Sequence, residues 1–411
     1  MSILLLLIIY IAFISLGLPD SMLGSSFPAI AENLNIASDM AGYIALTVSA
    51  CTIVSSLFSA KLIEKFSTKW VVFVSVLLTA TGLVLFSQVK EGYTWLFFLI
   101  AVPMGLGAGA IDAALNNYVA LHYKAIHMNW LHCSWGIGAS IGPMILGSFI
   151  DSDKASAGWD KGVLIISIIQ FSIALILLIS LPLWNKMASK ESKEPKEEIK
   201  QVKKFSYKDL FKTPVFYLSM IGFFGYCALE TTTGLWTGSF FSYGKGLSTS
   251  KAATLTSVFY LGITVGRFIC GPISLKFKEK NMMRIGESIL LVGTVLTMIP
   301  FNIWFSIIGL SLIGIGCAPI YPAIIRSTPY RFSKEASQKA MGIEMAIAYC
   351  GNLSIPPLFG LIAKSLGNNF SILPYMILAL LLLMIIVHEI INVILQKRDV
   401  ALTEEEKKEY F

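Results

Sequence analysis

Long apolar stretches separated by short polar segments run along the whole sequence. Twelve of these stretches approach the roughly 20 residues that a helix needs to cross the hydrocarbon core of a bilayer. The pattern therefore predicts an all-α membrane protein with twelve transmembrane helices. The predicted helices cover residues 4–30, 40–62, 70–88, 94–121, 129–150, 162–184, 215–241, 250–274, 285–300, 303–325, 340–364 and 371–395.

The one long polar stretch lies in the middle of the chain and mixes Lys with Glu. We interpret residues 186–213 as a cytoplasmic linker. It separates an N-terminal six-helix half, residues 1–185, from a C-terminal six-helix half, residues 214–396. Residues 397–411 are then a cytoplasmic tail.

Motifs of the first half recur in the second at a nearly constant distance. The separation is 210 residues from Asp20 to Glu230, 209 from Gly105 to Gly314 and 213 from Gly138 to Gly351. Such a repeat predicts two pseudo-symmetric halves. Transporters built in this way hold their substrate between the halves, near the middle of the membrane.

Composition supports a membrane protein and excludes a soluble globular one. Hydrophobic residues make up 55% of the chain and charged residues only 14%, with a mean hydropathy of +0.72, whereas about a quarter of a soluble protein is charged. The net charge of +7 does not indicate nucleic-acid binding, because Lys and Arg are spread over short loops rather than gathered on one face.

The basic residues concentrate in alternate loops, which predicts the orientation of the chain. One set of loops, together with the tail, holds Lys61, Lys65, Lys69, Lys124, Lys276, Lys278, Lys280, Arg284, Arg326, Arg331, Lys334, Lys339, Lys397 and Arg398. We therefore expect both termini in the cytoplasm and a multi-pass protein of the plasma (inner) membrane. The first apolar stretch lacks a preceding basic region and is too long for a signal peptide, so we expect it to be retained.

An acidic residue, Asp112, lies inside the apolar stretch "GAGAIDAALNN". On a helix it shares a face with Gly105, Ala108, Gly109 and Asn116. A carboxyl group in the membrane is costly unless it is paired, protonated or facing water. Asp112 could carry a proton, because burial makes a carboxyl group hold its proton at higher pH. Alternatively, it accepts hydrogen bonds from a neighbouring helix and only stabilises packing.

A second acidic residue, Asp20, follows Pro19 midway along the first predicted helix. Gly17, Gly24 and Pro28 lie nearby, so we expect the helix to be kinked or loosened there. Asp20 could contact substrate or a proton, or it could cap the backbone amides that the break leaves free.

Three stretches resemble a known family. "GAGAIDAALNNYV", "NWLHCSWGIGASIGP" and "YCALETTTGLW" are similar to the fucose permease-like sugar:proton symporters of the major facilitator superfamily. The resemblance implies the major facilitator fold, sugar uptake and a proton-coupling role for Asp112. In fucose permease the acid of the first helix stands about one turn further on, where this chain has Gly24.

The resemblance also covers the superfamily's gating signatures. In "AKLIEKFSTK" Glu64 holds the acidic position and Lys65 a basic one, while Ser67 replaces a glycine. "GRFICGP", with Arg267, is similar to the counterpart in the second half. These positions imply gating roles for Glu64, Lys65 and Arg267.

Further polar and aromatic residues are candidate substrate contacts. Glu230 and Trp236 could form a sugar platform, in which the indole ring stacks on the sugar, or Trp236 could simply pack. Asn129, His132 and Trp135 precede a glycine-rich run, and His132 could equally be an interhelical donor. Glu344 and Asn352 could line the cavity or pair with Arg267 or Arg326. The full set of predicted substrate contacts is Asp20, Asn116, Asn129, His132, Trp135, Glu230, Trp236, Glu344 and Asn352.

Other chemistry is not indicated. The six Cys residues lie inside predicted helices without paired spacing, the four His residues lack zinc spacing, and no phosphate-binding loop is present. We expect no cofactor, no metal, no enzymatic activity and a monomeric protein. The expected partners are a small solute such as a sugar, protons and the lipid bilayer, with no nucleic acid.

The leading interpretation is a secondary active transporter that takes up a neutral monosaccharide or a similar small polar solute with protons. "GASIGPMILG" also resembles a signature of drug antiporters, so proton-driven efflux is the alternative. A membrane sensor that does not transport belongs to another class. Flux measured in liposomes distinguishes that class from the other two.

Overall fold

The computed structural model describes residues 3–123, 125–191, 210–274, 276–332 and 334–401. Apart from one isolated bridge between Asp151 and Ala157, these residues form helices, turns and loops. The helices are α1 (Ile3–Asp20), α2 (Met22–Asn33), α3 (Met40–Ser87), α4 (Leu96–His122), α5 (Ala125–Phe149), α6 (Trp159–Glu191), α8 (Pro214–Ser239), α9 (Thr249–Ile273), α10 (Glu279–Met298), α11 (Ile303–Phe332), α12 (Lys334–Ser365) and α13 (Leu373–Ala401), with short η1 (Phe240–Gly244) and η2 (Phe370–Ile372) turns.

The predicted twelve membrane helices are confirmed. Nine segments among the described residues are long and apolar enough to cross a membrane, and α1 with α2 counts as one of them. Another, α3, consists of two arms, because Ser67 has non-helical backbone angles in its middle. The second arm of α3, together with α5 and α10, completes the twelve.

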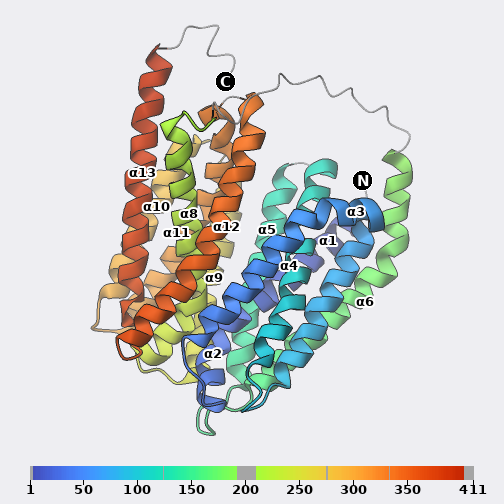
Figure 1. Cartoon of the computed structure of the whole chain (residues 1–411), viewed down its shortest axis with the longest axis vertical. Coiled ribbons are helices and arrows are strands. Elements are labelled where there is room, and N and C mark those ends of the chain that lie inside the picture. Colours follow the sequence, from blue (N-terminus) through green and yellow to red (C-terminus); the bar gives the residue numbers. More distant parts are fainter. Residues whose placement is uncertain (1–2, 124, 192–209, 275, 333, 402–411) are drawn as a thin grey trace.

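The helices form two bundles, α1–α6 and α8–α13 (Figure 1). The bundles meet at one end, which we call the closed end. They diverge at the other end, where α1 and α8 begin and α6 and α13 end, which we call the termini end (Figure 1). Residues 192–209 of the predicted linker and 402–411 of the predicted tail lie outside the described residues. The helix α6 ends at Glu191 and α8 begins at Pro214.

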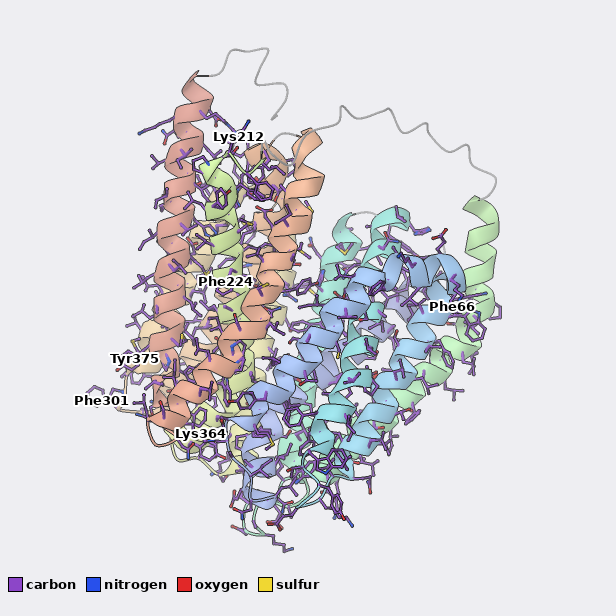
Figure 2. All side chains as sticks on the ribbon, viewed as in Figure 1. Phe66, Lys212, Phe224, Phe301, Lys364 and Tyr375 are labelled. Carbon is purple, nitrogen blue, oxygen red and sulfur yellow. The ribbon has the colours of Figure 1, made fainter. Side chains whose placement is uncertain are left out.

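Large apolar side chains cover the outside of both bundles (Figure 2). Leu57, Ile179 and Phe268 are each about 70% exposed, at 75%, 71% and 68%. In water such a surface would favour aggregation, whereas lipid tails solvate it. This outer surface agrees with a protein that lies in a bilayer.

The small face predicted around Asp112 is a packing face. A side chain at Gly109 would place its Cβ 2.1 Å from the Thr52 carbonyl oxygen, so α4 and the first arm of α3 are in backbone contact there. Ser56 Oγ donates a hydrogen bond to the Gly109 carbonyl at 3.1 Å, and Thr52 Oγ1 donates to the Gly105 carbonyl at 3.2 Å. These contacts fix the position of α4 and therefore of Asp112.

Candidate functional site

A cavity of about 430 Å³ lies between the two bundles. This volume is typical of a site for one small molecule. Predicted residues from both halves line it: Asp20, Asp112, Asn129, His132 and Trp135 from the first, Glu230, Arg267 and Asn352 from the second. The repeat interface is therefore where these residues meet, as the sequence predicts.

The middle of the cavity holds a chain of contacts that crosses between the halves. Trp135 Nε1 donates a hydrogen bond to Asp20 Oδ2 at 2.7 Å. The Arg267 guanidinium lies over the Trp135 ring, 5.0 Å from the ring centre. Arg267 Nη2 in turn lies 3.5 Å from Glu230 Oε1. The acids at equivalent positions of the two halves, Asp20 and Glu230, are thus connected through Trp135 and Arg267.

The helix break predicted at Asp20 is confirmed. The helix α1 ends at Asp20 and α2 begins at Met22. One turn earlier, a Cβ at Gly17 would come within 2.0 Å of the Trp135 carbonyl oxygen. This close approach of α1 to α5 brings Asp20 within reach of the Trp135 indole. The Asp20 side chain is exposed, and its accessible surface faces the cavity.

Asp112 lines the cavity from α4, while Asn116 lies one turn behind it. Asn116 Nδ2 donates a hydrogen bond to Asp112 Oδ1 at 2.9 Å, and the buried Asn116 Oδ1 has no hydrogen-bond partner among the described residues. The structure does not place Asn116 at the cavity surface, which corrects its prediction as a substrate contact. Its amide orients the Asp112 carboxylate instead.

The remaining polar residues of the cavity have few recorded partners in the part of the chain that the structure describes. His132 has the Phe13 ring at its edge, with ring centres 5.6 Å apart. Asn352 Oδ1 accepts a hydrogen bond from Thr231 Oγ1 at 3.3 Å. Asn129 lies at the cavity surface. These side chains are positioned to offer hydrogen bonds to a bound solute.

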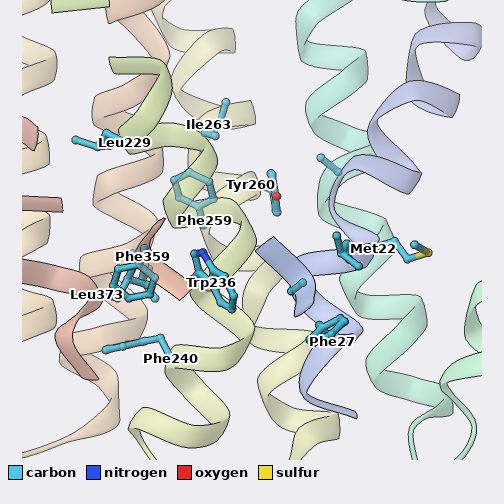
Figure 3. Packing of buried hydrophobic residues seen from close by; sticks show 14 of the residues in the cluster. Met22, Phe27, Leu229, Trp236, Phe240, Phe259, Tyr260, Ile263, Phe359 and Leu373 are labelled. Atoms are coloured by element: carbon cyan, nitrogen blue, oxygen red, sulfur yellow. The ribbon is translucent and has the colours of Figure 1, made fainter. Parts of the chain in front are cut away.

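Trp236 does not reach the cavity. Its ring is fully buried in the apolar cluster that also contains Phe240 and Phe359 (Figure 3). It stacks on Phe370, with ring centres 5.2 Å apart, and Nε1 donates a hydrogen bond to the Pro356 carbonyl at 2.8 Å. This geometry corrects the prediction of Trp236 as a sugar platform and supports the alternative, packing. The ring lies on the side of α8 that faces the C-terminal core, whereas Glu230 faces the cavity.

Glu344 is also outside the cavity. It is fully buried, and its Oε2 accepts a hydrogen bond from Thr328 Oγ1 at 2.9 Å. The charged group that acts on Glu344 is the Arg331 guanidinium. Arg331 Nη1 donates a hydrogen bond to Ser219 Oγ at 3.1 Å. The structure therefore corrects both predictions for Glu344, since it neither lines the cavity nor pairs with Arg267 or Arg326.

The predicted gating residues occupy two different places. Glu64 and Lys65 are exposed, next to the bend of α3 at Ser67. Ser67 has a φ of 64°, a backbone conformation that glycine adopts more readily, in line with the glycine it replaces. Arg267 instead faces the cavity as the partner of Glu230.

Sequence reasoning missed several residues of the cavity. Tyr260 lies edge-on to Trp135, with ring centres 6.1 Å apart, and Tyr321, Thr231 and Arg326 also line the cavity. An aromatic or threonine inside a membrane helix gives no signal that separates a cavity position from a packing one. The distribution of basic residues predicts a loop position for Arg326. The helix α11 instead continues through Arg326 to Phe332, and the Arg326 side chain lines the cavity.

The cavity is sealed at the closed end by contacts between the halves. Lys364 Nζ of α12 lies 3.0 Å from Asp39 Oδ1 at the start of α3. Ser250 Oγ of α9 donates to the Gly147 carbonyl of α5 at 2.6 Å. A Cβ at Gly24 would come within 2.5 Å of the Gly234 carbonyl oxygen, so α2 and α8 are also in backbone contact.

Two known proteins are similar to this chain in sequence. The chain is 21% identical to "Bypass of stop codon protein 6" of Saccharomyces cerevisiae, over 88% of this chain and 77% of that protein. It is 23% identical to the "Glucose/mannose transporter GlcP" of Bacillus subtilis, over 76% and 77%.

Two solved structures show a similar fold. An inward-facing, unoccupied bacterial homolog of the human lysosomal transporter Spinster aligns with a TM-score of 0.69 and 12% identity, covering 95% of this chain and 96% of that one. The D-xylose-proton symporter aligns with a TM-score of 0.67 and 14% identity, covering 92% and 96%.

The Major Facilitator Superfamily model matches residues 9–255 and 238–409, which together cover almost the whole chain. Two pseudo-symmetric bundles around a central cavity agree with that match. The chain therefore belongs to the Major Facilitator Superfamily and is a membrane transporter rather than an enzyme.

Proposed function

We propose that this transporter takes up a neutral monosaccharide or a similar small polar solute together with protons, by alternating access. The observation that carries the proposal is the cavity between the halves, closed at one end and lined by three carboxyl side chains. A site of this kind can bind a solute at one membrane face and release it at the other when the bundles rock.

The charges of the cavity favour a neutral solute. Three acids, Asp20, Asp112 and Glu230, face two bases, Arg267 and Arg326. The sum is −1 with every group ionised and zero when one carboxyl group holds a proton. A neutral solute bound with one proton then leaves the loaded cavity without net charge, which favours its reorientation across the membrane.

Polar groups suited to sugar hydroxyls surround this centre. Asn129, His132, Asn352 and Thr231 can donate or accept hydrogen bonds, and the Trp135 and Tyr260 rings supply apolar faces. The similarity to a glucose/mannose transporter and the fold shared with a xylose-proton symporter point to the same class of solute.

Asp112 and Asp20 are the proposed proton carriers. Glu230 forms an ion pair with Arg267, whereas no ion pair is recorded for Asp112 or Asp20 among the described residues. Each accepts a hydrogen bond from a neutral side chain, which leaves it free to take up and release a proton.

The proposed orientation has both termini in the cytoplasm of a cell whose plasma or inner membrane holds the protein. The structure then represents a state closed towards the outside, since the closed end is opposite the termini (Figure 1). Residues 186–213 act in this proposal as the linker between the halves, and a single chain contains the complete cavity.

Purified protein in liposomes tests the proposal. We expect an inward proton gradient to drive accumulation of at least one radiolabelled neutral monosaccharide above its external concentration, and a protonophore to abolish it. Accumulation driven by a sodium gradient would show that sodium, rather than the proton, is the coupling ion. The sodium-dependent glucose transporter 1A of Mus musculus, which is 24% identical over 61% of this chain, is the reason to test sodium. Export of solutes in exchange for protons would favour the efflux alternative, and absence of flux over a broad panel would favour a sensor.

A further inference from the structure

The Arg267–Glu230 pair is the one ion pair recorded inside the cavity among the described residues. Arg267 comes from α9 and Glu230 from α8, and both side chains are partly accessible, at 14% and 18%. A solute in the cavity can therefore touch the pair. Because both side chains are mostly buried, their charges interact more strongly than charges at a protein surface do.

Among the residues that the structure describes, the pair leaves Arg267 with unused hydrogen-bond donors. Nη2 approaches Glu230 Oε1 at 3.5 Å, a single contact at the outer limit for a hydrogen bond. The Trp135 ring covers one face of the guanidinium. The group has five N–H donors, so most of them remain available to the oxygens of a solute while its positive charge is balanced.

A guanidinium without a carboxylate partner would select a different solute. Arginine binds carboxylates in a two-pronged geometry that is stronger than hydrogen bonds to neutral oxygens. An unbalanced Arg267 would then prefer a solute that brings its own carboxylate, such as a sugar acid. Neither other acid replaces Glu230, since Asp20 bonds to the Trp135 indole and Asp112 to the Asn116 amide.

We infer that Glu230 determines the charge selectivity of the transporter. By balancing Arg267 it makes the cavity accept neutral polyhydroxylated solutes and reject anionic ones, while Arg267 in turn makes it reject cationic ones. The inference rests on the proposed function and names the residue pair that selects the charge of its solute.

The experiment uses sugars that share a ring and differ in charge. The probes are glucose with glucuronate, galactose with galacturonate, and glucosamine as the cation. Binding to the purified full chain is measured by thermal shift at pH 7, since a ligand that binds the folded state stabilises it. The variants are Glu230→Gln, Glu230→Asp, Arg267→Gln and the double variant Glu230→Gln with Arg267→Gln. Glu389→Gln is the matched control, because it removes the partner of an exposed arginine, Arg284, outside the cavity.

We expect Glu230→Gln to bind at least one of the two uronates about tenfold or more tightly than the wild type. Glu230→Asp should retain the wild-type preference, because it keeps the charge. Adding Arg267→Gln should remove the gain, and Glu389→Gln should show none. Arg267→Gln, which leaves Glu230 unbalanced, should gain affinity for glucosamine.

Two results would overturn the inference: a folded Glu230→Gln variant without a gain for either uronate, or a gain that persists in the double variant. If Glu230→Gln does not fold, an unchanged response of Arg267→Gln to glucosamine overturns it instead. Failure of the wild type to bind any neutral sugar would count against the proposed solute class. The inference about Glu230 would still be tested separately, by the affinity of Glu230→Gln for uronates and of Arg267→Gln for glucosamine.

Discussion

Lys364 and Asp39 form an ion pair of 3.0 Å that joins the two halves at the closed end of the cavity. Asp39 precedes the first turn of α3, and Lys364 lies in the last turn of α12. The pseudo-symmetric contact, between the start of α9 and the loop after α5, is neutral: Thr249 Oγ1 lies 3.1 Å from Ser152 Oγ. Of these two symmetry-related contacts, one is therefore charged and one uncharged, and the charged one can be weakened by removing a single charge.

The first prediction is that Lys364→Gln opens the closed end more than Asp39→Asn does. Asp39 is 4% exposed, so removing Lys364 leaves a buried carboxylate without its partner. Removing Asp39 leaves a half-exposed Lys364 that water can solvate. Because the pair is partly exposed, we expect Asp39→Asn to weaken closure by about 0.5–1 kcal/mol, a shift of about two- to fivefold in the ratio of open to closed molecules.

Fluorescence energy transfer between dyes at two exposed loop positions measures this opening. The dyes are placed on cysteines at Lys90 and Phe301 in a background without the native cysteines, since these positions lie in loops of opposite halves. Lys154→Gln is the matched control, because Lys154 pairs with Asp151 within one half. An equal shift in the control would mean that loop charge, rather than the seal, sets the distance.

The second prediction is that Trp236 supports folding rather than substrate recognition. Trp236→Ala should lower stability by about 3–5 kcal/mol, the usual cost of removing a large buried aromatic side chain. Trp236→Phe should cost less, because it keeps a ring against Phe370 and loses mainly the hydrogen bond to the Pro356 carbonyl. Thermal unfolding in detergent measures both, with the 62% exposed Trp304→Ala as control. A stable Trp236→Ala variant that no longer binds substrate would restore the sugar platform.

The fold could be predicted from the sequence because one physical requirement dominates it. Each membrane helix must be about 20 residues long and apolar. Because lipid contacts the outer faces of these helices, each one appears in the sequence as a long apolar stretch that can be counted. The element α3 shows the limit of such reasoning. The sequence predicts two helices joined by a polar loop, whereas in the structure helical turns continue on both sides of a single non-helical residue, Ser67.

The candidate site was harder to predict than the fold. Asp20, Asp112 and Glu230 could be found, because a carboxyl group inside an apolar stretch is costly and has to be explained. Trp236 could not be placed, since an indole ring is compatible with both a cavity and a core, and the orientation of α8 decides between them. Glu344 was misplaced for a related reason. Its buried neighbour Arg331 comes from a different helix, α11, and no sequence spacing reveals that contact.

The third prediction concerns a buried pair outside the cavity. His388 Nδ1 of α13 lies 2.5 Å from Glu287 Oε1 of α10, and both residues are 3% exposed. His388→Leu should destabilise the protein by about 3–5 kcal/mol, because it leaves the Glu287 carboxyl group buried without a partner. The double variant Glu287→Leu with His388→Leu should recover part of that loss, because no unpaired polar group remains.

Thermal unfolding of the two single variants and the double variant tests this prediction as a double-mutant cycle. Glu389→Gln, next to His388 but in an exposed pair with Arg284, should change stability by less than about 1 kcal/mol. Strictly additive effects of Glu287→Leu and His388→Leu would show that the two side chains do not depend on each other.

The fourth prediction is that Asp112→Asn separates accumulation from exchange. Asparagine is nearly isosteric with aspartate and can keep a hydrogen bond to Asn116, but it cannot take up and release a proton. Exchange of labelled for unlabelled solute requires only that the loaded carrier reorients, and a neutral side chain imitates the protonated acid. Accumulation requires the empty carrier to return after losing its proton. We therefore expect proton-driven accumulation to be abolished while exchange and binding are largely retained.

Both assays are run in the same vesicles at several pH values, with Asp153→Asn as the matched control. Asp153 lies in an exposed loop at the closed end, away from the cavity. A packing role for Asp112 would change accumulation and exchange together through expression or stability, because its partner Asn116 lies on the same helix and the substitution would disturb α4 as a whole. Normal pH-dependent accumulation in Asp112→Asn would remove Asp112 from the mechanism. Asp20, the other cavity acid with no recorded ion pair among the described residues, would then be the first candidate for the proton carrier.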